Sequence, residues 1–404
     1  TSKTVSWLGS DMNQKSTVST PAAVNADMTW EKIRTLDFGF DAGFLNNELN
    51  VTFDWYLRRN VGMLVSGNEI IRYVGIASAP LENGGDLKTT GWELQIDYNH
   101  AFNKDFAVYG TFTLADSKSE ITKWNNTTGA LQGWYEGKQL GEIWGFETDR
   151  YFNSSELNSD GTLKEGIPDQ SYIQTGSFRF GAGDVKFKDI DGSGKIDTGK
   201  GTIDDHGDLK RIGNALPRYE YSLRLGAMFK GFDFEVLFQG VGKRDMWTTS
   251  SLFIPHAAGA QMNIFENQLD YWTENNQNAR FPRPYINSAF GSLSGLPSNS
   301  GINNFVPQTK YLNNLAYLRV KNLTVGYTIP QNLTQKVSVE KLRIYFSAQN
   351  LLTFDHIDGV MDPESTGGWS SGLNVDSLSG VDTRYAGRSM PFNRQWSCGV
   401  QITF

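Results

Sequence analysis

The most specific chemical motif of the chain is an acidic loop, DIDGSGKID, at residues 189–197. It resembles the start of an EF-hand-type loop, in which oxygen atoms from alternate residues surround a hard cation. The predicted ligands are Asp189, Asp191, Ser193, the carbonyl oxygen of Lys195, and Asp197. Gly194 would make the sharp turn, and Ile196 would anchor the loop in an apolar core. We therefore expect a structural Ca²⁺ or Mg²⁺ that braces this segment.

The EF-hand pattern is incomplete at its last position, where a bidentate Glu is normal and this chain has Lys200. A carboxylate further along could complete the site, and Asp204, Asp205 and Asp208 are all candidates. The alternative is a turn of Asp and Gly residues that binds no metal. In either case the segment has a structural role, and no organic cofactor is expected.

Tryptophan is frequent outside the segments that are predicted below as strands. Because an aromatic ring presents a flat apolar face, it can stack on a sugar ring and line a glycan path. The candidates for such contacts are Trp134, Trp144, Trp247 and Trp369. Two alternatives stay open, namely that these rings fill small cores within long loops or that they contact a partner protein.

Several classes of protein are excluded by what the sequence lacks. It has no Gly-x-Ser-x-Gly, His-Glu-x-x-His or P-loop motif, so an enzyme is not expected. The Asp204–Asp205 pair is one of the chance pairs that 44 acidic residues produce. A net charge of −7 without a run of Lys and Arg argues against nucleic-acid binding. The single Cys398 excludes an intramolecular disulfide framework.

The elements that must position these residues are strands. Apolar and polar residues alternate with period two in nine segments, which is typical of strands with one apolar face. The composition, with 13% aromatic residues and 42 Gly, also favours an all-β fold. The nine segments are 36–44, 49–57, 92–98, 106–114, 219–229, 232–238, 323–329, 342–346 and 396–404.

The connections between these segments alternate strictly in length. Short ones lie near 46–48, 102–105, 230–231 and 330–339, and long ones span 60–88, 119–217, 244–315 and 355–393. This alternation is typical of bacterial outer-membrane barrels, which have short periplasmic turns and long extracellular loops. The sequence therefore predicts an antiparallel transmembrane β-barrel in the outer membrane. A soluble antiparallel sheet with one solvated face is the alternative.

The polar face of the predicted strands is strongly charged. It carries Asp37, Asp41, Asp54, Glu93, Asp97, Glu220, Arg224, Asp233 and Glu235. Such a face fits a wet or plugged lumen, with the apolar face toward lipid. Nine strands is an odd number, whereas single-chain bacterial barrels have an even number. Residues 1–404 are therefore expected to form part of a barrel and not to close alone. The first ten residues do not resemble a signal peptide, so an export signal is expected upstream.

Several stretches resemble the SusC/RagA family of TonB-dependent transporters from Bacteroidetes. They are LRVKNLTVGYTIP at 318–330, LRIYFSAQNLL at 342–352, MDPE at 361–364, GWEL at 91–94, and IGN at 212–214 followed by Pro217 and Tyr219. Each stretch is weak alone, but together they are specific and extend over essentially the whole chain.

The resemblance implies a function that composition alone does not. The chain would be the C-terminal part, strands 14 to 22, of a barrel of about 22 strands with a plugged lumen. The plug domain, the remaining strands and the TonB contact would lie in an N-terminal region that this chain lacks. A SusD-like surface lipoprotein would cover the barrel mouth. The expected cargo is an oligosaccharide, with an oligopeptide as the alternative in the same family and a surface binding or adhesion barrel as a third reading.

Overall fold

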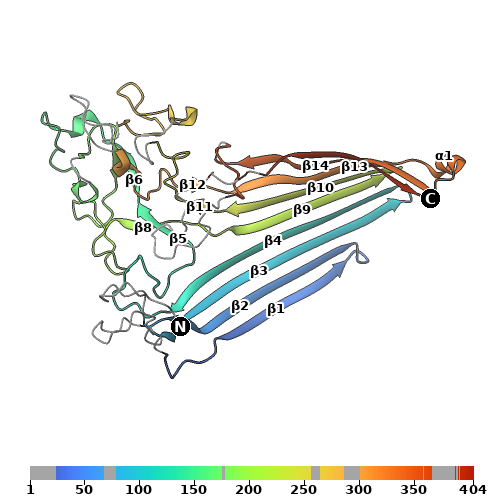
Figure 1. Cartoon of the computed structure of the whole chain (residues 1–404), viewed down its shortest axis with the longest axis horizontal. Coiled ribbons are helices and arrows are strands. Elements are labelled where there is room, and N and C mark those ends of the chain that lie inside the picture. The colour runs from blue at the N-terminus through green and yellow to red at the C-terminus, as the bar shows by residue number, and fades with distance from the viewer. Residues whose placement is uncertain are drawn as a thin grey trace, which may run out of the picture.

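The computed structural model describes residues 24–67, 79–174, 178–255, 264–285, 301–357, 359–365, 387, 390 and 392–404. Two regions are plain in Figure 1: a sheet of long strands, and a lobe built from the long connections at one end of that sheet. None of the helices in the described ranges is long and apolar enough to cross a membrane.

The long strands form one antiparallel sheet of nine strands within the described residues. Their order follows the chain, so each strand pairs with the strand before it and the strand after it. The strands are β1 (Lys32–Phe44), β2 (Leu49–Ser66), β3 (Leu81–Asn103), β4 (Phe106–Lys123), β9 (Arg218–Phe229), β10 (Phe232–Lys243), β13 (Tyr317–Thr328), β14 (Lys341–Asp355) and β15 (Gln395–Thr403). The nine predicted strands are confirmed, and β2, β3 and β4 extend further toward the lobe than the alternation indicated.

The short connections lie at the end of the sheet that is far from the lobe (Figure 1). Lys230 and Gly231 have φ of 47° and 88°, which is the left-handed pair that a tight hairpin turn requires. The turn between β1 and β2 uses three residues of positive φ, Leu45, Asn46 and Asn47. The connection from β13 to β14 holds a single turn of helix, α1 (Gln331–Thr334), and the 3₁₀ turn η7 (Gln335–Val337).

The two faces of the sheet differ in chemistry, as the alternation predicts. Register places Phe38 opposite Trp55 and Trp55 opposite Trp92 on the apolar face. Phe38 and Phe40 are 69% and 50% exposed, as expected for side chains that face lipid. The opposite face carries ion pairs instead, and one of them joins Arg224 to Glu235 at 2.6 Å.

Aromatic rings gather on the apolar face near the short turns. Rings of Tyr98, His100, Phe102, Phe106 and Phe229 follow one another with centroid distances of 4.4–6.3 Å. Such a band is typical of the membrane–water interface of barrels. The ring of Tyr327 lies beside that of Phe232 on the same face. Tyr56, by contrast, lies on the polar face, over Gly91.

The long connections fold into a lobe of short elements. In its described residues, three two-stranded sheets brace it: β5 (Glu142–Phe146) with β8 (Leu209–Asn214), β6 (Thr148–Tyr151) with β7 (Val185–Phe187), and β11 (Asp245–Met246) with β12 (Asn313–Asn314). Its 3₁₀ turns are η2 (Ser154–Glu156), η3 (Ser171–Ile173), η4 (Glu266–Gln268) and η6 (Gly301–Phe305). Residues from connections 119–217 and 244–315 share one buried apolar core, so the two connections form a single unit.

Candidate functional site

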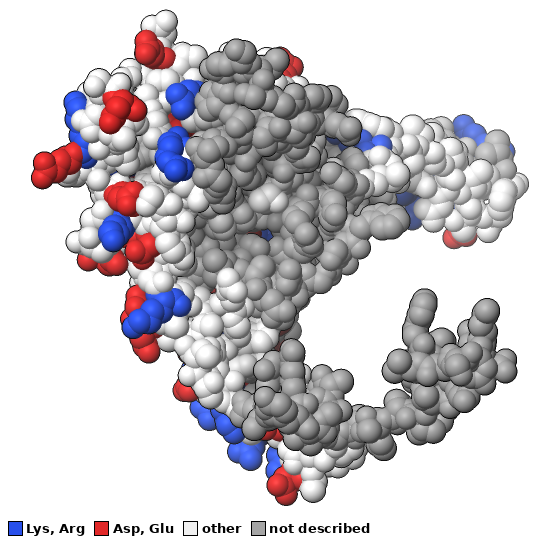
Figure 2. Space-filling model, turned by 60° about the vertical axis from the view of Figure 1, so that its left-hand side comes forward, with Lys and Arg blue, Asp and Glu red and all other residues white. Residues whose placement is uncertain are grey.

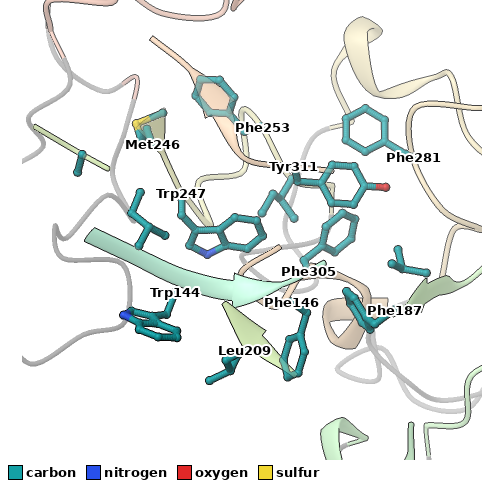
Figure 3. Packing of buried hydrophobic residues seen from close by; sticks show 14 of the residues in the cluster. Trp144, Phe146, Phe187, Leu209, Met246, Trp247, Phe253, Phe281, Phe305 and Tyr311 are labelled. Atoms are coloured by element: carbon teal, nitrogen blue, oxygen red, sulfur yellow. The ribbon is translucent and has the colours of Figure 1, made fainter. Parts of the chain in front are cut away.

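Two of the four candidate tryptophans lie inside the core of the lobe. Trp144 and Trp247 are each 4% exposed and pack among Phe146, Met246 and other apolar side chains (Figure 3). The indole Nε1 of Trp144 donates to Glu142 Oε1 at 2.8 Å, which satisfies the polar end of the buried ring. Neither ring presents a free face, so neither is available to stack on a sugar.

The other two candidates differ from these. Trp134 is half-buried, with its ring 5.8 Å from that of Trp124 and with the Lys138 ammonium 5.5 Å from its centroid. It therefore keeps part of its surface on the outside of the lobe. Trp369 lies outside the described residues.

The acidic loop brings three carboxylates together. Oxygen atoms of Asp189, Asp191 and Asp208 lie within 4.8 Å of one another. Of the three later carboxylates that could complete the motif, Asp208 is therefore the one that the fold places at the loop. Asp204 is exposed, and Asp205 instead lies 3.5 Å from the ammonium of Lys200.

The turn around these carboxylates is tight. Asp189 accepts hydrogen bonds from the main-chain nitrogens of Gly192 and Gly194, both at 2.8 Å. Gly192 and Gly194 have φ of 75° and 78°, a backbone conformation that residues with a Cβ atom rarely adopt. Ile196 is fully buried in the lobe core, as an apolar anchor must be.

The remaining predicted ligands have other contacts. The Ser193 hydroxyl donates to the carbonyl oxygen of Lys195 at 3.1 Å. The carboxylate of Asp197 accepts from the main-chain nitrogen of Gly199 at 2.7 Å. The main-chain nitrogen of Asp197 donates to Asp208, which ties the two ends of the loop together. The structure thus groups Asp189 and Asp191 with Asp208 and turns Asp197 toward a different neighbour.

The donor set fits a hard cation. Three carboxylates supply oxygen ligands of the kind that Ca²⁺ and Mg²⁺ prefer. Asp208 is fully buried, and burial raises its pKa above the ordinary value, although two main-chain nitrogens donate to its carboxylate. A cation among these groups would balance the charge that burial makes costly.

A second buried carboxylate, which the sequence did not single out, joins the two long connections. Asp184 accepts hydrogen bonds from the Tyr285 hydroxyl at 2.5 Å and from Asn304 Nδ2 at 2.9 Å. The guanidinium of Arg283 lies 3.6 Å away. Burial raises the pKa of Asp184 to about 6, despite these donors. No local motif marks this residue, because its partners lie about a hundred positions further along the chain.

A third cluster connects two of the stretches that carry the family resemblance. Arg319, in β13, is 1% exposed and donates to the carboxylate of Asp362 at 2.7 and 2.8 Å. It also forms an ion pair with Glu364, and Lys321 binds the same Glu364 at 3.0 Å. The Leu-Arg stretch and the Asp-Pro-Glu stretch are therefore partners, and their contact holds the start of connection 355–393 against the sheet.

The described residues of the lobe form a groove and a pocket at its surface. One is a broad polar groove of about 990 Å³, lined by residues that include Asp160, Lys164, Asp169, Arg179 and Tyr285. The other is a smaller, apolar pocket of about 200 Å³, lined by residues that include Pro255, Leu269, Tyr271, Pro282 and Phe305. The first has the hydrogen-bonding groups that a sugar needs, whereas the second fits an apolar side chain.

The chain is similar in sequence to known TonB-dependent receptors. The chain is 24% identical over 393 residues to TonB-dependent receptor P3 of Formosa agariphila, covering 94% of this chain and 35% of that protein. It is 25% identical over 390 residues to TonB-dependent receptor SusC of Bacteroides thetaiotaomicron, covering 93% of this chain and 33% of SusC. The chain is homologous to SusC-type TonB-dependent receptors. It spans about a third of the length of these relatives.

Solved structures support the same conclusion about the fold. The RagAB peptide transporter matches with a TM-score of 0.60 at 22% identity, covering 99% of this chain and 38% of that chain. The RagAB peptide importer in its open-open state matches with a TM-score of 0.61. No family model matches the chain. The nine-stranded sheet thus has the fold of part of an outer-membrane β-barrel like those of SusC and RagA.

Proposed function

We propose that this chain forms part of the wall and the extracellular lobe of a TonB-dependent importer that takes up oligosaccharides together with a SusD-like lipoprotein. The homology with SusC over nearly the whole chain is the observation that carries the proposal. The plug, the TonB contact and the other strands would be supplied by the rest of the protein. The charged face of β9 and β10, with Arg224 and Glu235, suits a lumen that is filled by a polar domain and water.

The polar groove of the lobe supports an oligosaccharide as the cargo. Its lining offers carboxylates, hydroxyls, the ammonium of Lys164 and the guanidinium groups of Arg179 and Arg283 around a hollow of about 990 Å³. Trp134 is the one candidate tryptophan in the described residues that keeps an exposed ring surface. The groove thus supplies hydrogen-bonding groups, and Trp134, which does not line it, supplies a ring surface elsewhere on the lobe; sugar recognition uses both kinds of contact.

An oligopeptide is the second candidate cargo, and a specific observation favours it. The small apolar pocket beside Leu269 and Tyr271 would accept an aliphatic or aromatic side chain, and its surface offers little to a sugar. The solved structures that share this fold are described as a peptide transporter and a peptide importer. A barrel that only displays its loops for binding or adhesion is the third reading.

The decisive experiment uses the intact protein, purified with its co-expressed lipoprotein. Mass spectrometry of the released ligand should identify an oligosaccharide, and labelled ligand should enter cells in a TonB-dependent manner. Replacing Lys164 with Ala in the groove should weaken glycan binding, whereas Leu269→Asp in the apolar pocket should not. A bound peptide whose affinity falls with Leu269→Asp would instead establish the second candidate. Ligand binding without TonB-dependent entry would instead establish the third candidate, a barrel that displays its loops for binding or adhesion.

We also propose that Asp189, Asp191 and Asp208 hold a structural Ca²⁺ or Mg²⁺. The support is the grouping of three carboxylates, one of them fully buried, around a turn that two glycines of positive φ make possible. The cation would fix the loop against the anchor Ile196 and so stabilise the extracellular lobe. The role is structural, because these carboxylates line neither hollow of the lobe.

A further inference from the structure

Four basic side chains meet on the outer face of the barrel, just above its apolar belt. Register places Arg34 directly opposite Arg59, and Arg59 directly opposite Lys88. Lys118 lies two register positions nearer the belt, opposite Thr90 and level with Leu57. These four residues come from β1, β2, β3 and β4, and together they are called the basic patch below.

The basic patch shares its face with lipid-exposed residues. Side chains two positions apart on a strand point the same way. Arg59 follows Leu57 and Trp55 at this spacing, and Lys88 precedes Thr90 and Trp92. Between Leu87 and Ala101 the pairing of β3 with β4 has no bulge. Side chains that alternate along this part of β3 and β4 therefore stay on the same face of the sheet throughout, and Lys88 and Lys118 share the face of Trp92. The patch therefore continues the lipid-facing surface, about 7 Å further along the strands than Leu57.

The patch lies at the extracellular end of the strands. Short turns of outer-membrane barrels face the periplasm and long loops face the outside. Arg34 is near the start of β1 and Arg59 is in the second half of β2, so both are on the side of the lobe. In Figure 2, Lys and Arg side chains gather in the lower part of the view, where β1 to β4 lie in Figure 1. The patch is thus at the level where the headgroups of the outer leaflet begin.

The arrangement is unfavourable without an anion. Like charges directly opposite each other destabilise a pair of strands, and here three cations stand in one row. Within the described residues, none of the four forms an ion pair or a side-chain hydrogen bond. The side chains of Arg34, Arg59 and Lys118 are exposed, and that of Lys88 is half-buried.

The nearby acids form contacts with groups outside the patch. Asp116 forms an ion pair with Arg218, Asp86 accepts from the main-chain nitrogen of Gly62, and Glu31 accepts from that of Leu64. Glu120 alone stands in the same row, opposite Lys88. Among the described residues, this one carboxylate stands against four cations, so the patch keeps a net positive charge that attracts an anion.

We propose that Arg34, Arg59, Lys88 and Lys118 bind the phosphate groups of a glycolipid in the outer leaflet of the outer membrane. Guanidinium groups bind phosphate in bidentate fashion and ammonium groups bind it as point charges. The acyl chains of the same lipid would lie on the apolar belt formed by Leu36, Leu57 and Trp92, directly below the phosphates. Charge complementarity and continuity with the belt favour a lipid over a soluble anion.

The first test compares two lipids on the unaltered protein. The intact receptor is placed in phosphatidylcholine nanodiscs with lipid A or with lipid A that has been dephosphorylated, and native mass spectrometry counts the retained molecules. Phosphorylated lipid A should be retained roughly tenfold better, because each phosphate meets several cations. Equal retention of the two lipids would overturn the proposal, and so would its displacement by an equal concentration of inorganic phosphate.

The second test uses variants with a matched control. Arg34→Gln, Arg59→Gln and Lys88→Gln together should remove the preference for phosphorylated lipid A. Arg58→Gln is the control, because Arg58 is adjacent in sequence but faces the lumen side, opposite Thr89. An unchanged preference in the triple variant would refute the proposal. If the triple variant does not assemble, judged by heat-dependent mobility on gels, Lys118→Gln alone should still reduce the preference. Because the readout is lipid retention, failure here is independent of whether the receptor imports its ligand.

Discussion

The ring of Tyr109, on β4, lies flat against Gly226 on the neighbouring β9, so closely that a Cβ atom on Gly226 would overlap the ring. The Tyr109 hydroxyl reaches across to Glu235 on β10 at 2.9 Å, which spans three strands with one side chain. The same relationship recurs in three further directly paired positions. They are Tyr56 over Gly91, Tyr221 over Gly240, and Tyr345 over Gly399.

These contacts predict that Gly226 cannot carry a side chain. Gly226→Val should destabilise the assembled barrel by about 1–3 kcal/mol, because the ring must leave its place against the sheet. Heat-dependent gel mobility of the intact receptor measures this as a lower dissociation temperature. Combining the change with Tyr109→Ala should remove most of the penalty, since the space is then free. Gly133→Ala serves as control, because a Cβ there would meet its neighbours only at 3.7 Å or beyond. Equal effects of the two glycine changes would contradict the explanation.

Much of the sheet could be predicted from the sequence because its determinants are local. Alternation with period two identifies each strand and its faces, and turns such as Lys230-Gly231 limit how neighbouring strands can pair. The strand ends near the lobe were less predictable. β3 begins at Leu81, eleven residues before Trp92, where alternation is interrupted by glycines and polar residues on both faces. There the pairing with β2 and β4, and not the pattern, maintains the strand.

The sites depend on contacts between distant residues, which a single sequence does not reveal. The acidic loop was visible, but the choice of Asp208 among three carboxylates required the closed turn. Arg319 and Asp362 each belong to a recognisable stretch, yet only the structure shows that they bind each other. The basic patch has no sequence signature, because Arg34, Arg59 and Lys88 are separated by more than twenty positions and meet through strand register alone.

The proposed cation site predicts a Ca²⁺-dependent stability of the lobe. Removal of divalent cations with EDTA should lower the temperature at which the lobe unfolds, and added Ca²⁺ should restore it. Asp208→Asn should abolish this response, because the site loses one of its three carboxylates. Asp204→Asn should leave the response intact, since Asp204 is exposed and lies outside the group. A receptor whose lobe unfolds at the same temperature with and without Ca²⁺ would have no such site.

Replacement of Arg319 should release connection 355–393 from the sheet, because Arg319 binds two carboxylates of that connection. Arg319→Gln leaves Asp362 and Glu364 without their main partner in a buried setting, which typically costs about 3–5 kcal/mol. The connection should then detach from the sheet and become sensitive to limited proteolysis. Lys321→Gln is the control, because Lys321 is more exposed and its ion pair should contribute less than about 1 kcal/mol. Similar proteolysis of the two variants would mean that Arg319 does not secure the connection.

The carboxylates of the lobe predict how its stability changes with pH. Burial raises the pKa of Asp184 to about 6. A raised pKa in the folded state means that protonation stabilises the fold, so this gain is complete below the ordinary pKa and is lost as the pH rises through about 6. Glu147 and Glu156 behave in the opposite way. Hydrogen bonds from Lys188 and Lys210, and from Arg150, lower their pKa values to about 2, so their contribution is present above the ordinary pKa and is lost in stronger acid.

The lobe should therefore be more stable near pH 5 than near pH 7, by about 1 kcal/mol from Asp184. Hydrogen exchange of the main chain around Asp184, corrected for the intrinsic effect of pH, measures the difference. Asp184→Asn should flatten the response between pH 7 and pH 5, because an amide keeps hydrogen bonds to its neighbours without titrating. The groups that face Asp184, namely Arg283, Tyr285 and Asn304, stay in the same protonation state over this range. A pH response that persists in Asp184→Asn would assign the effect to a different group.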